Sequence, residues 1–376
     1  MEKQLFTSEA VSIGHPDKVC DQISDAILDA CLEQDRDSRV AVETLATTST
    51  VVIAGEITTR ANIKPDCIAR DVIRQVGYEE EGFDWRTVNV QTLLHQQSTD
   101  IAQGVDASDT HQQGAGDQGM MFGYAEDNPD ENYLPLPIFH AHQLMRRMER
   151  VRLENDCGIK YLRPDAKCQM TFDFTEPDHV RLSTVVLSHQ HTPDMPRGVL
   201  ENLLKIELVK MFPDKYLTKD TEILVNPTGR FVIGGPAADT GLTGRKIIVD
   251  TYGGMGRHGG GAFSGKDASK VDRSAAYMCR HVAKHIVKRG FCERCEIQVA
   301  YAIGIAEPVS LRVFSFNNKR IDFDLEDYVR KNFDFRPAAI TEYLGLKQPD
   351  GWTYLETAQH GHFTNPEFPW EREAKI

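Results

Sequence analysis

Glycine and lysine concentrate in one stretch of this sequence, and together they predict a site for phosphate groups. Seven glycines lie from Gly253 to Gly265, and Lys266 follows directly. Glycine allows backbone N–H groups to approach phosphate oxygens closely, and a lysine behind them neutralises negative charge. We therefore expect Gly259–Lys270 (GGGAFSGKDASK) to form part of a grip on a nucleotide triphosphate. A flexible glycine linker, the simpler alternative, would leave the charged residues behind the glycines unexplained.

The same stretch fits the P-loop pattern G-x-x-x-x-G-K from Gly260 to Lys266. A P-loop needs Ser or Thr at the next position to bind magnesium, but this chain has Asp267 there. An acidic side chain at that position would repel a phosphate unless a metal intervened. A P-loop ATPase or kinase, which would transfer the γ-phosphate or form ADP, is therefore disfavoured, and phosphate binding remains the prediction.

Two shorter motifs combine glycine with polar or charged residues. Gly114–Gly119 (GAGDQG) matches the dinucleotide fingerprint, but polar residues precede it and no helix clearly follows, so a tight turn presenting Asp117 is favoured. Gly14–Lys18 (GHPDK) opens a predicted helix, whose N-terminal N–H groups favour an anion. His15 adds a donor there and Asp17 can hold a hard cation. A plain capping turn with solvated side chains is the alternative.

Further cations occur in Arg163–Lys167 (RPDAK) and Gly241–Lys246 (GLTGRK), and each of these segments is also compatible with ordinary solvated charge. If the cations gather in space, they can wrap three phosphates while two carboxylates hold magnesium. The cationic residues are His15, Lys167, Arg245, Lys246, Lys266 and Lys270, and the carboxylates are Asp17 and Asp272.

Composition excludes several classes of protein. A net charge of −13 argues against a nucleic-acid binder, which needs a basic surface. The apolar runs are too short to span a membrane, and Met1–Ala10 lacks the apolar core of a secretory signal, so we expect a cytoplasmic location. Cys292 and Cys295 form a C-x-x-C pair, but no second pair completes a zinc site. Free thiols in a reducing compartment are favoured over a redox site.

Hydrophobic periodicity predicts the order helix, strand, strand, helix in each third of the chain. We expect an α/β protein of the α+β type with three similar domains, each having a mixed or antiparallel sheet built on antiparallel hairpins. The long aperiodic stretch Gln97–Gln118 is expected to be a lid or a binding loop. The predicted domains are 1–105, 114–231 and 233–376. The predicted helices are one that opens at Pro16, then Asp66–Val76, Ile138–Glu154, Gly198–Met211, Asp272–Lys288 and Leu325–Asn332; the predicted strands are Arg39–Ala46, Val51–Thr59, Lys167–Phe174, Val180–Ser188, Glu296–Ile303 and Ser310–Phe316, with a strand-like run at Arg245–Thr251.

GHPDK, GAGDQG and GGGAFSGKD, in this order and at these separations, resemble the signatures of the S-adenosylmethionine synthetase (methionine adenosyltransferase) family. The resemblance runs from Leu5 to the region of Trp370 and includes Asn226–Pro236 and Gly241–Met255. It implies three similar domains about a pseudo-threefold axis. It also implies a homo-oligomer, either a dimer or a dimer of dimers (a homotetramer), with each active site at a dimer interface.

The resemblance implies a reaction in which the sulfur of L-methionine attacks C5′ of ATP, after which the released tripolyphosphate is hydrolysed to phosphate and diphosphate. A thioether is already a nucleophile, so the reaction needs fixed cations for the leaving polyanion more than a general base. Two Mg²⁺ per site and K⁺ are the implied cofactors, with Asp17 and Asp272 as magnesium ligands and Glu43 placing potassium. The implied catalytic residues are His15, Lys167, Arg245, Lys246, Lys266 and Lys270; the ATP contacts are His15, Asp165, Lys167, Arg230, Phe231, Asp239, Arg245, Lys246, Ala262, Lys266 and Ile303; the methionine contacts are Glu56, Gln97, Asp117, Asp239 and Lys270.

The resemblance also identifies residues 97–107 with a mobile gate, in agreement with the predicted lid. Ile13 departs from the family pattern, which usually has a polar or acidic residue there, so altered local packing or affinity is expected. A non-catalytic binding subunit is the second alternative, and it predicts nucleotide binding without turnover. The sequence speaks against it, because every proposed cation and metal ligand is present.

Overall fold

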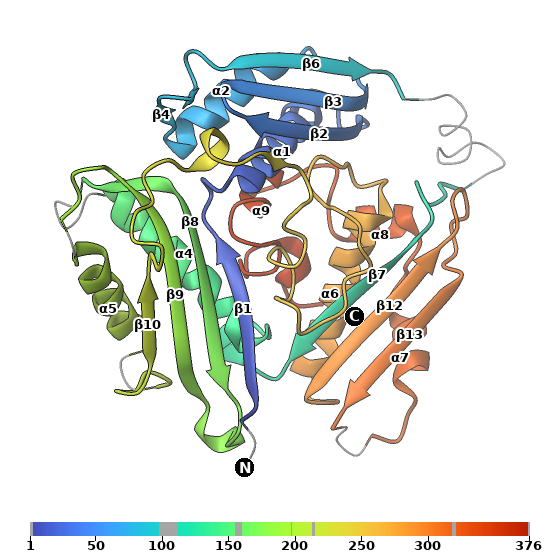
Figure 1. The fold of residues 1–376 in the computed structure, drawn as a ribbon. Coiled ribbons are helices and arrows are strands. Elements are labelled where there is room, and N and C mark those ends of the chain that lie inside the picture. Colours follow the sequence, from blue (N-terminus) through green and yellow to red (C-terminus); the bar gives the residue numbers. More distant parts are fainter. Residues whose placement is uncertain are drawn as a thin grey trace.

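Three β-sheets surround a common centre, and the chain visits each sheet more than once (Figure 1). The computed structural model describes residues 3–97, 112–154, 160–196, 198–212, 215–317 and 321–374. The first sheet has the strand order β11 (Gly241–Leu242), β2 (Arg39–Thr47), β3 (Thr50–Thr58), β6 (Asn89–His95). The second has the order β1 (Leu5–Val11), β8 (Leu162–Asp173), β9 (Arg181–His191), β10 (Glu222–Val225). The third has the order β13 (Ser310–Phe316), β12 (Arg294–Tyr301), β7 (Gly119–Glu126), and β4 (Glu79–Glu80) and β5 (Phe83–Asp84) form a small separate ribbon.

The helices cover the inward faces of the sheets. The helices α1, α4 and α6 each pack on one sheet, on the side that faces the centre (Figure 1). The α-helices are α1 (Pro16–Gln34), α2 (Pro65–Val76), α4 (Leu136–Glu154), α5 (Val199–Met211), α6 (Val271–Lys288), α7 (Leu325–Asn332), α8 (Pro337–Tyr343) and α9 (Tyr354–Thr357), and short 3₁₀ helices occupy Pro129–Glu131, Pro177–His179, Gly235–Ala237 and Pro369–Glu371.

The predicted mixed α/β fold in three similar parts is confirmed. The three predicted hairpins are antiparallel pairs: β2 with β3, β8 with β9, and β12 with β13. The pairs of β6 with β3 and of β10 with β9 are parallel, so the first two sheets are mixed. Apart from the strand-like run at Arg245–Thr251, the predicted helices and strands agree with the observed bounds to within a few residues, because each carries a strong local period.

Each predicted domain lends one strand to the sheet of another. The strand β1 pairs with β8 of the predicted central domain, β7 pairs with β12 of the predicted C-terminal domain, and β11 returns to pair with β2. In Figure 1 the blue β1 lies beside the green β8, and the teal β7 beside the orange β12. The strands β1, β7 and β11 were not predicted from the sequence. Their pairing partners lie far along the chain, and local periodicity does not report them.

The predicted strand at Arg245–Thr251 is wrong. These residues form turns, in which Asp250 N donates to Lys246 O at 2.8 Å and Gly253 N donates to Ile248 O at 3.0 Å. The three consecutive β-branched residues Ile247–Val249 gave the run its strand-like character. Since the main-chain groups here bond within the segment, the segment cannot pair as a strand.

The central helix α1 is buried around most of its circumference. Its apolar side Val19, Ile23 and Ile27 has no exposed surface, and Pro16 opens the helix where a missing N–H costs nothing. Its polar residues are buried too, which places charged groups inside the protein. Ile13, which departs from the family pattern, is also buried and belongs to the apolar core.

Among the residues that the structure describes, no helix is both long and apolar enough to cross a membrane. The predicted lid, Gln97–Gln118, falls largely on residues 98–111, which lie outside the described ranges. Cys292 and Cys295 are described, and both are free and buried.

Candidate functional site

His15 caps the N-terminus of α1, and this fixes which of its ring nitrogens carries a proton. Its Nδ1 accepts a hydrogen bond from Asp17 N at 3.2 Å, so Nδ1 is unprotonated and the hydrogen is on Nε2. Burial, followed by the charges of Lys246 and Lys167, lowers the pKa of His15 to about 3. The ring is therefore a neutral hydrogen-bond donor near neutral pH.

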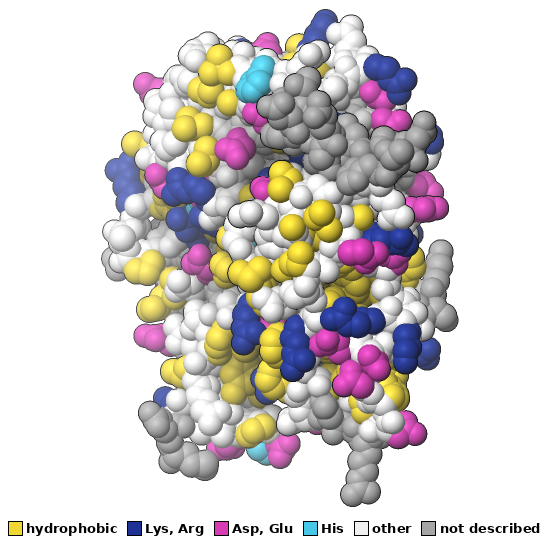
Figure 2. Space-filling view, turned by 90° about the vertical axis from the view of Figure 1, so that its right-hand side faces the viewer, with side chains coloured by type: hydrophobic (Ala, Val, Ile, Leu, Met, Phe, Trp, Pro, Cys, Tyr) yellow, Lys and Arg dark blue, Asp and Glu magenta, His cyan; other side chains and the backbone are white. Residues whose placement is uncertain are grey.

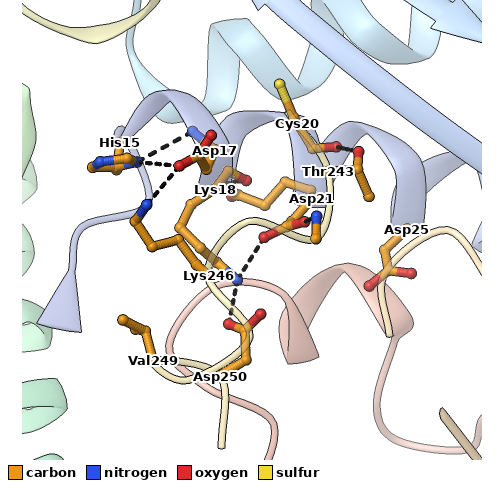
Figure 3. Close-up of polar contacts among 12 residues, drawn as sticks. His15, Asp17, Lys18, Cys20, Asp21, Asp25, Thr243, Lys246, Val249 and Asp250 are labelled. Atoms are coloured by element: carbon orange, nitrogen blue, oxygen red, sulfur yellow. Dashed lines mark hydrogen bonds and ion pairs between the residues drawn. The ribbon is translucent and has the colours of Figure 1, made fainter. Parts of the chain in front are cut away.

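Asp17 joins the start of α1 to the loop that carries two of the predicted cations (Figure 3). Its Oδ1 accepts from Leu242 N at 2.9 Å, and its Oδ2 accepts from Lys246 Nζ at 2.6 Å. Arg245 Nε lies 3.7 Å from Oδ1. Burial alone would raise the pKa of Asp17, but the bonds from Lys246 and Leu242 hold it below its ordinary value. The carboxylate stays ionised and available to a cation.

A buried ion cluster supports this part of the site. Lys18 Nζ lies 2.6 Å from Asp250 Oδ1 and 3.0 Å from Asp21 Oδ2, and all three side chains are almost fully buried (Figure 3). Although burial opposes its charge, the two carboxylates raise the pKa of Lys18. Sequence reasoning did not assign Asp21 or Asp250, because only the fold shows which cation each one meets.

The strand β8 brings Lys167 to the same place. Lys167 pairs in register with Val11, four residues before His15. Nearby Asp165 is buried, accepts from Gly235 N at 2.8 Å, and leaves its other oxygen without a described partner. Burial raises the pKa of Asp165 to about 6. An unsatisfied buried carboxyl oxygen is suited to a hydroxyl or amine donor of a ligand.

A second cluster is built by the glycine-rich stretch. Lys266 Nζ lies 2.7 Å from Asp272 Oδ2, and Lys270 Nζ lies 2.6 Å from Asp267 Oδ2. Asp267 also accepts from Val40 N at 2.7 Å and is 3% exposed, so its carboxylate faces the protein interior. Its position explains why an acidic residue here is compatible with phosphate binding.

Glycine is required at two positions of this stretch. Gly265 has φ +80°, and a Cβ there would lie 2.0 Å from Val42 O. A Cβ on Gly261 would lie 2.3 Å from Asp272 Oδ1. The glycines thus allow the loop to lie directly against β2 and against a predicted metal ligand.

Lys266 of this cluster also lines a cavity of about 260 Å³ on the first sheet. The cavity combines small residues with two glutamates and this one lysine, so polar groups of both charges converge on it. The lining residues that sequence analysis assigned are Glu43, Glu56, Ala262 and Lys266.

Other predicted residues lie in contacts of their own. Gln97 N donates to Thr58 Oγ1 at 3.2 Å, at the end of β3. Asp117 is exposed and accepts from its neighbour Gln118 N, and Ile303 bridges to Ala115 in the adjoining turn. The remaining three are Arg230, which is exposed, Phe231, whose N–H donates to His191 Nε2 at 3.2 Å, and Asp239, whose N–H donates to Gly235 O at 3.1 Å.

The described residues contain no group of three or more His, Cys, Asp or Glu side chains arranged to hold a metal ion. Asp17 and Asp272 each stand as single carboxylates beside a lysine. Magnesium in phosphate-binding enzymes is commonly held by one or two carboxylates together with substrate phosphates and water. The two carboxylates therefore fit phosphate-bound magnesium better than an ion held by the protein alone.

Comparison with known proteins gives matches over nearly the whole chain. Family models of S-adenosylmethionine synthetase match residues 3–99 (N-terminal domain), 112–231 (central domain) and 233–372 (C-terminal domain). The S-adenosylmethionine synthase of Desulfosudis oleivorans is 53% identical over 375 residues, covering 98% of this chain and 95% of that protein. That of Akkermansia muciniphila is 52% identical over 382 residues, covering 98% and 95%. That of Sorangium cellulosum is 50% identical over 378 residues, covering 99% and 88%.

Proposed function

Since the chain belongs to the S-adenosylmethionine synthetase family, we propose that it is a methionine adenosyltransferase that makes S-adenosylmethionine from ATP and L-methionine. A sulfur lone pair attacks C5′ of ATP, the C5′–O bond breaks, and its electrons leave with the tripolyphosphate. The enzyme then hydrolyses the tripolyphosphate to phosphate and diphosphate. The observation that supports this function best is a neutral histidine N–H held at a helix N-terminus beside cations.

His15 would donate its Nε2–H to the oxygen that leaves C5′. Because Nδ1 is already occupied by Asp17 N, the ring cannot turn its donor away without breaking the helix cap. A fixed donor costs no reorganisation while charge develops on the leaving oxygen. Lys167, Arg245 and Lys246 would neutralise the rest of the polyphosphate, and no proton needs to leave the thioether.

Two of the proposed phosphate-binding lysines are bonded to carboxylates, and a metal ion could bind each carboxylate in place of the lysine. Lys246 is bonded to Asp17, and Lys266 to Asp272. We propose that these carboxylates bind two Mg²⁺ per site and that the lysines turn to the phosphates. Magnesium, when bound, would supply further positive charge to the departing polyphosphate. Glu43, whose side chain lines the cavity beside Lys266, would place K⁺.

The remaining assigned residues would bind the two substrates. ATP would contact Lys266 and also Asp165, Arg230, Phe231, Asp239, Ala262 and Ile303. The carboxylate and amino groups of methionine would contact Glu56, Gln97, Asp117, Asp239 and Lys270. The lining of the cavity by Glu56 and Lys266 supports a place where both substrates meet.

We propose a homo-oligomer, either a dimer or a dimer of dimers, with each active site completed across a dimer interface. Exposed apolar residues on the outer faces of the sheets support this arrangement, because an interface could cover them; among them are Leu93 on β6, Met120 on β7 and Phe316 on β13. Figure 2 shows hydrophobic side chains spread among Lys and Arg on one such side of the molecule.

We further propose the domain bounds 1–105, 114–231 and 233–376 and a cytoplasmic location, with no nucleic acid or membrane as partner. The ranges of the three family matches support the bounds. The net charge of −13 supports the exclusion of nucleic acid.

One experiment tests the function. The chain is incubated with ATP, L-methionine, Mg²⁺ and K⁺, products are identified by mass, and a sample without methionine serves as the control. S-adenosylmethionine with phosphate and diphosphate supports the proposal. ADP without a sulfonium product would indicate a kinase or ATPase, and nucleotide binding without any product would indicate a binding subunit. Sizing chromatography of the same sample reports the oligomeric state.

A further inference from the structure

Four aspartates occur at every fourth position of α1, and each accepts hydrogen bonds from the backbone of a distant segment. Residues four apart lie on one side of an α-helix, about 6 Å apart along its axis. We call these four residues the aspartate row. Asp17 accepts from Leu242 N at 2.9 Å, Asp21 from Gly244 N at 2.8 Å, Asp25 from Gly265 N at 2.8 Å, and Asp29 from Tyr354 N and Leu355 N at 2.9 and 2.8 Å.

The middle two aspartates hold the backbone directly before the proposed phosphate-binding cations. Gly244, bonded to Asp21, immediately precedes Arg245 and Lys246. Gly265, bonded to Asp25, immediately precedes Lys266. Gly244 lies in the turn after β11, and Gly265 precedes an isolated bridge in which Lys266 pairs with Ala41 of β2. These backbone contacts hold the segments to β2, whereas the bonds to Asp21 and Asp25 hold them to α1.

Both middle aspartates are held rigidly. Asp21 and Asp25 have no exposed surface. Asp21 is anchored by Lys18, whose Nζ lies 3.0 Å from Asp21 Oδ2, and Asp25 receives two hydrogen bonds from Arg273, at 2.6 and 2.9 Å. Arg273 also donates to Lys266 O at 3.2 Å, so the same network holds Lys266 from a second side. Charge-assisted bonds of this kind are strong where water is excluded.

We propose that Asp21 and Asp25 are positioning residues of the reaction, which set the places of Arg245, Lys246 and Lys266 against the triphosphate from one side of α1. This inference rests on the proposed function, because it concerns the same cations. Displacement of a binding group by about 1 Å can reduce a rate about 10²-fold. Loss of a middle acceptor should thus impair ATP use much more than methionine binding.

Asp21 provides the sharper test, because a change of Asp25 would leave the buried Arg273 guanidinium without its carboxylate partner. In Asp21→Asn the amide oxygen still accepts from Gly244 N, whereas in Asp21→Ala no acceptor remains. Lys18 keeps Asp250 as its partner in both variants. We expect Asp21→Ala to lower kcat by about 10- to 100-fold and to raise KM for ATP, with KM for methionine nearly unchanged. We expect Asp21→Asn to stay within a few-fold of the parent in all three constants.

Asp29→Ala is the matched control. It removes two backbone bonds from the same row, but the segment at Tyr354 carries none of the assigned cations. It should lower the thermal midpoint while kcat stays within about twofold of the parent. An Asp21→Ala enzyme with parental kinetics, or Asn and Ala variants equally impaired, would overturn the positioning role.

Binding of inorganic tripolyphosphate with Mg²⁺, measured by calorimetry, separates this inference from the proposed function. If the parent protein makes no S-adenosylmethionine, the proposed function fails, and the effect on tripolyphosphate affinity still decides the positioning role. We expect Asp21→Ala to weaken that affinity at least tenfold, with Asp21→Asn and Asp29→Ala near the parent. Equal affinities for all four proteins would contradict the inference.

Discussion

Replacement of Arg273 by methionine should destabilise the protein more than almost any other single substitution in α6. Its guanidinium is 1% exposed and pairs with Asp25, which is 0% exposed. All five of its N–H donors are used: two bond Asp25, and the others bond Lys266 O, Thr357 Oγ1 and Tyr277 OH at 3.0 to 3.2 Å. Arg273→Met leaves the Asp25 carboxylate buried without a counter-charge.

The expected loss follows from that isolated charge. Removal of one partner of a buried ion pair costs about 3–5 kcal/mol, largely because the other charge is stranded. The double variant Asp25→Asn/Arg273→Met carries no stranded charge, and its asparagine can still accept from Gly265 N. It should therefore recover most of the loss and lie within about 1–2 kcal/mol of the parent.

Urea unfolding of the full chain, followed by circular dichroism, measures these free energies. Arg74→Met is the control, because Arg74 and Asp71 form a pair 3.0 Å apart whose side chains are 53% and 60% exposed. Loss of that pair should cost less than about 0.5 kcal/mol. An Arg273→Met variant within about 1 kcal/mol of the parent, or a double variant no more stable than the single one, would refute the reasoning.

Three further predictions concern the site and its pH dependence. Lys266→Ala should lower the turnover of ATP and methionine by about 10²-fold or more, with a much smaller change in methionine affinity. Single-turnover assays and equilibrium binding would measure both, and near-normal turnover would remove Lys266 from the mechanism. Glu43→Gln should abolish the acceleration by K⁺ that we expect in the parent, measured as initial rates across a potassium titration; a parent indifferent to K⁺ contradicts the assignment. Burial raises the pKa of Asp29 from 3.8 to about 7, so between these values the folded protein holds a proton that the unfolded chain has released. Stability should therefore fall as pH rises from about 4 to 7, and Asp29→Asn should flatten this slope in urea unfolding at pH 5 and pH 8; parallel slopes would rule out the contribution of Asp29.

The helices, the hairpins and the proposed phosphate-binding loop of this protein follow from its sequence, because each is recorded in neighbouring residues. The helix α6 and the strand β13 carry complete local periods, and their predicted bounds agree closely with the structure. The glycines before Lys266 indicate a loop that needs positive φ angles and close backbone contacts, and Gly265 has both. The family motifs also lie within short continuous stretches.

Only the tertiary structure decided how β1, β7 and β11 pair with strands of other predicted domains, and how the site is attached to α1. The strand β1 meets β8 across more than a hundred residues, and no local pattern specifies that pairing. Arg245–Thr251 contains a run of β-branched residues as a strand would, yet its backbone bonds are satisfied within turns. The spacing of Asp21 and Asp25 is visible in the sequence, but their partners are not. Hydrogen bonds and buried charges act between groups that meet in space, and the sequence alone does not say which groups will meet.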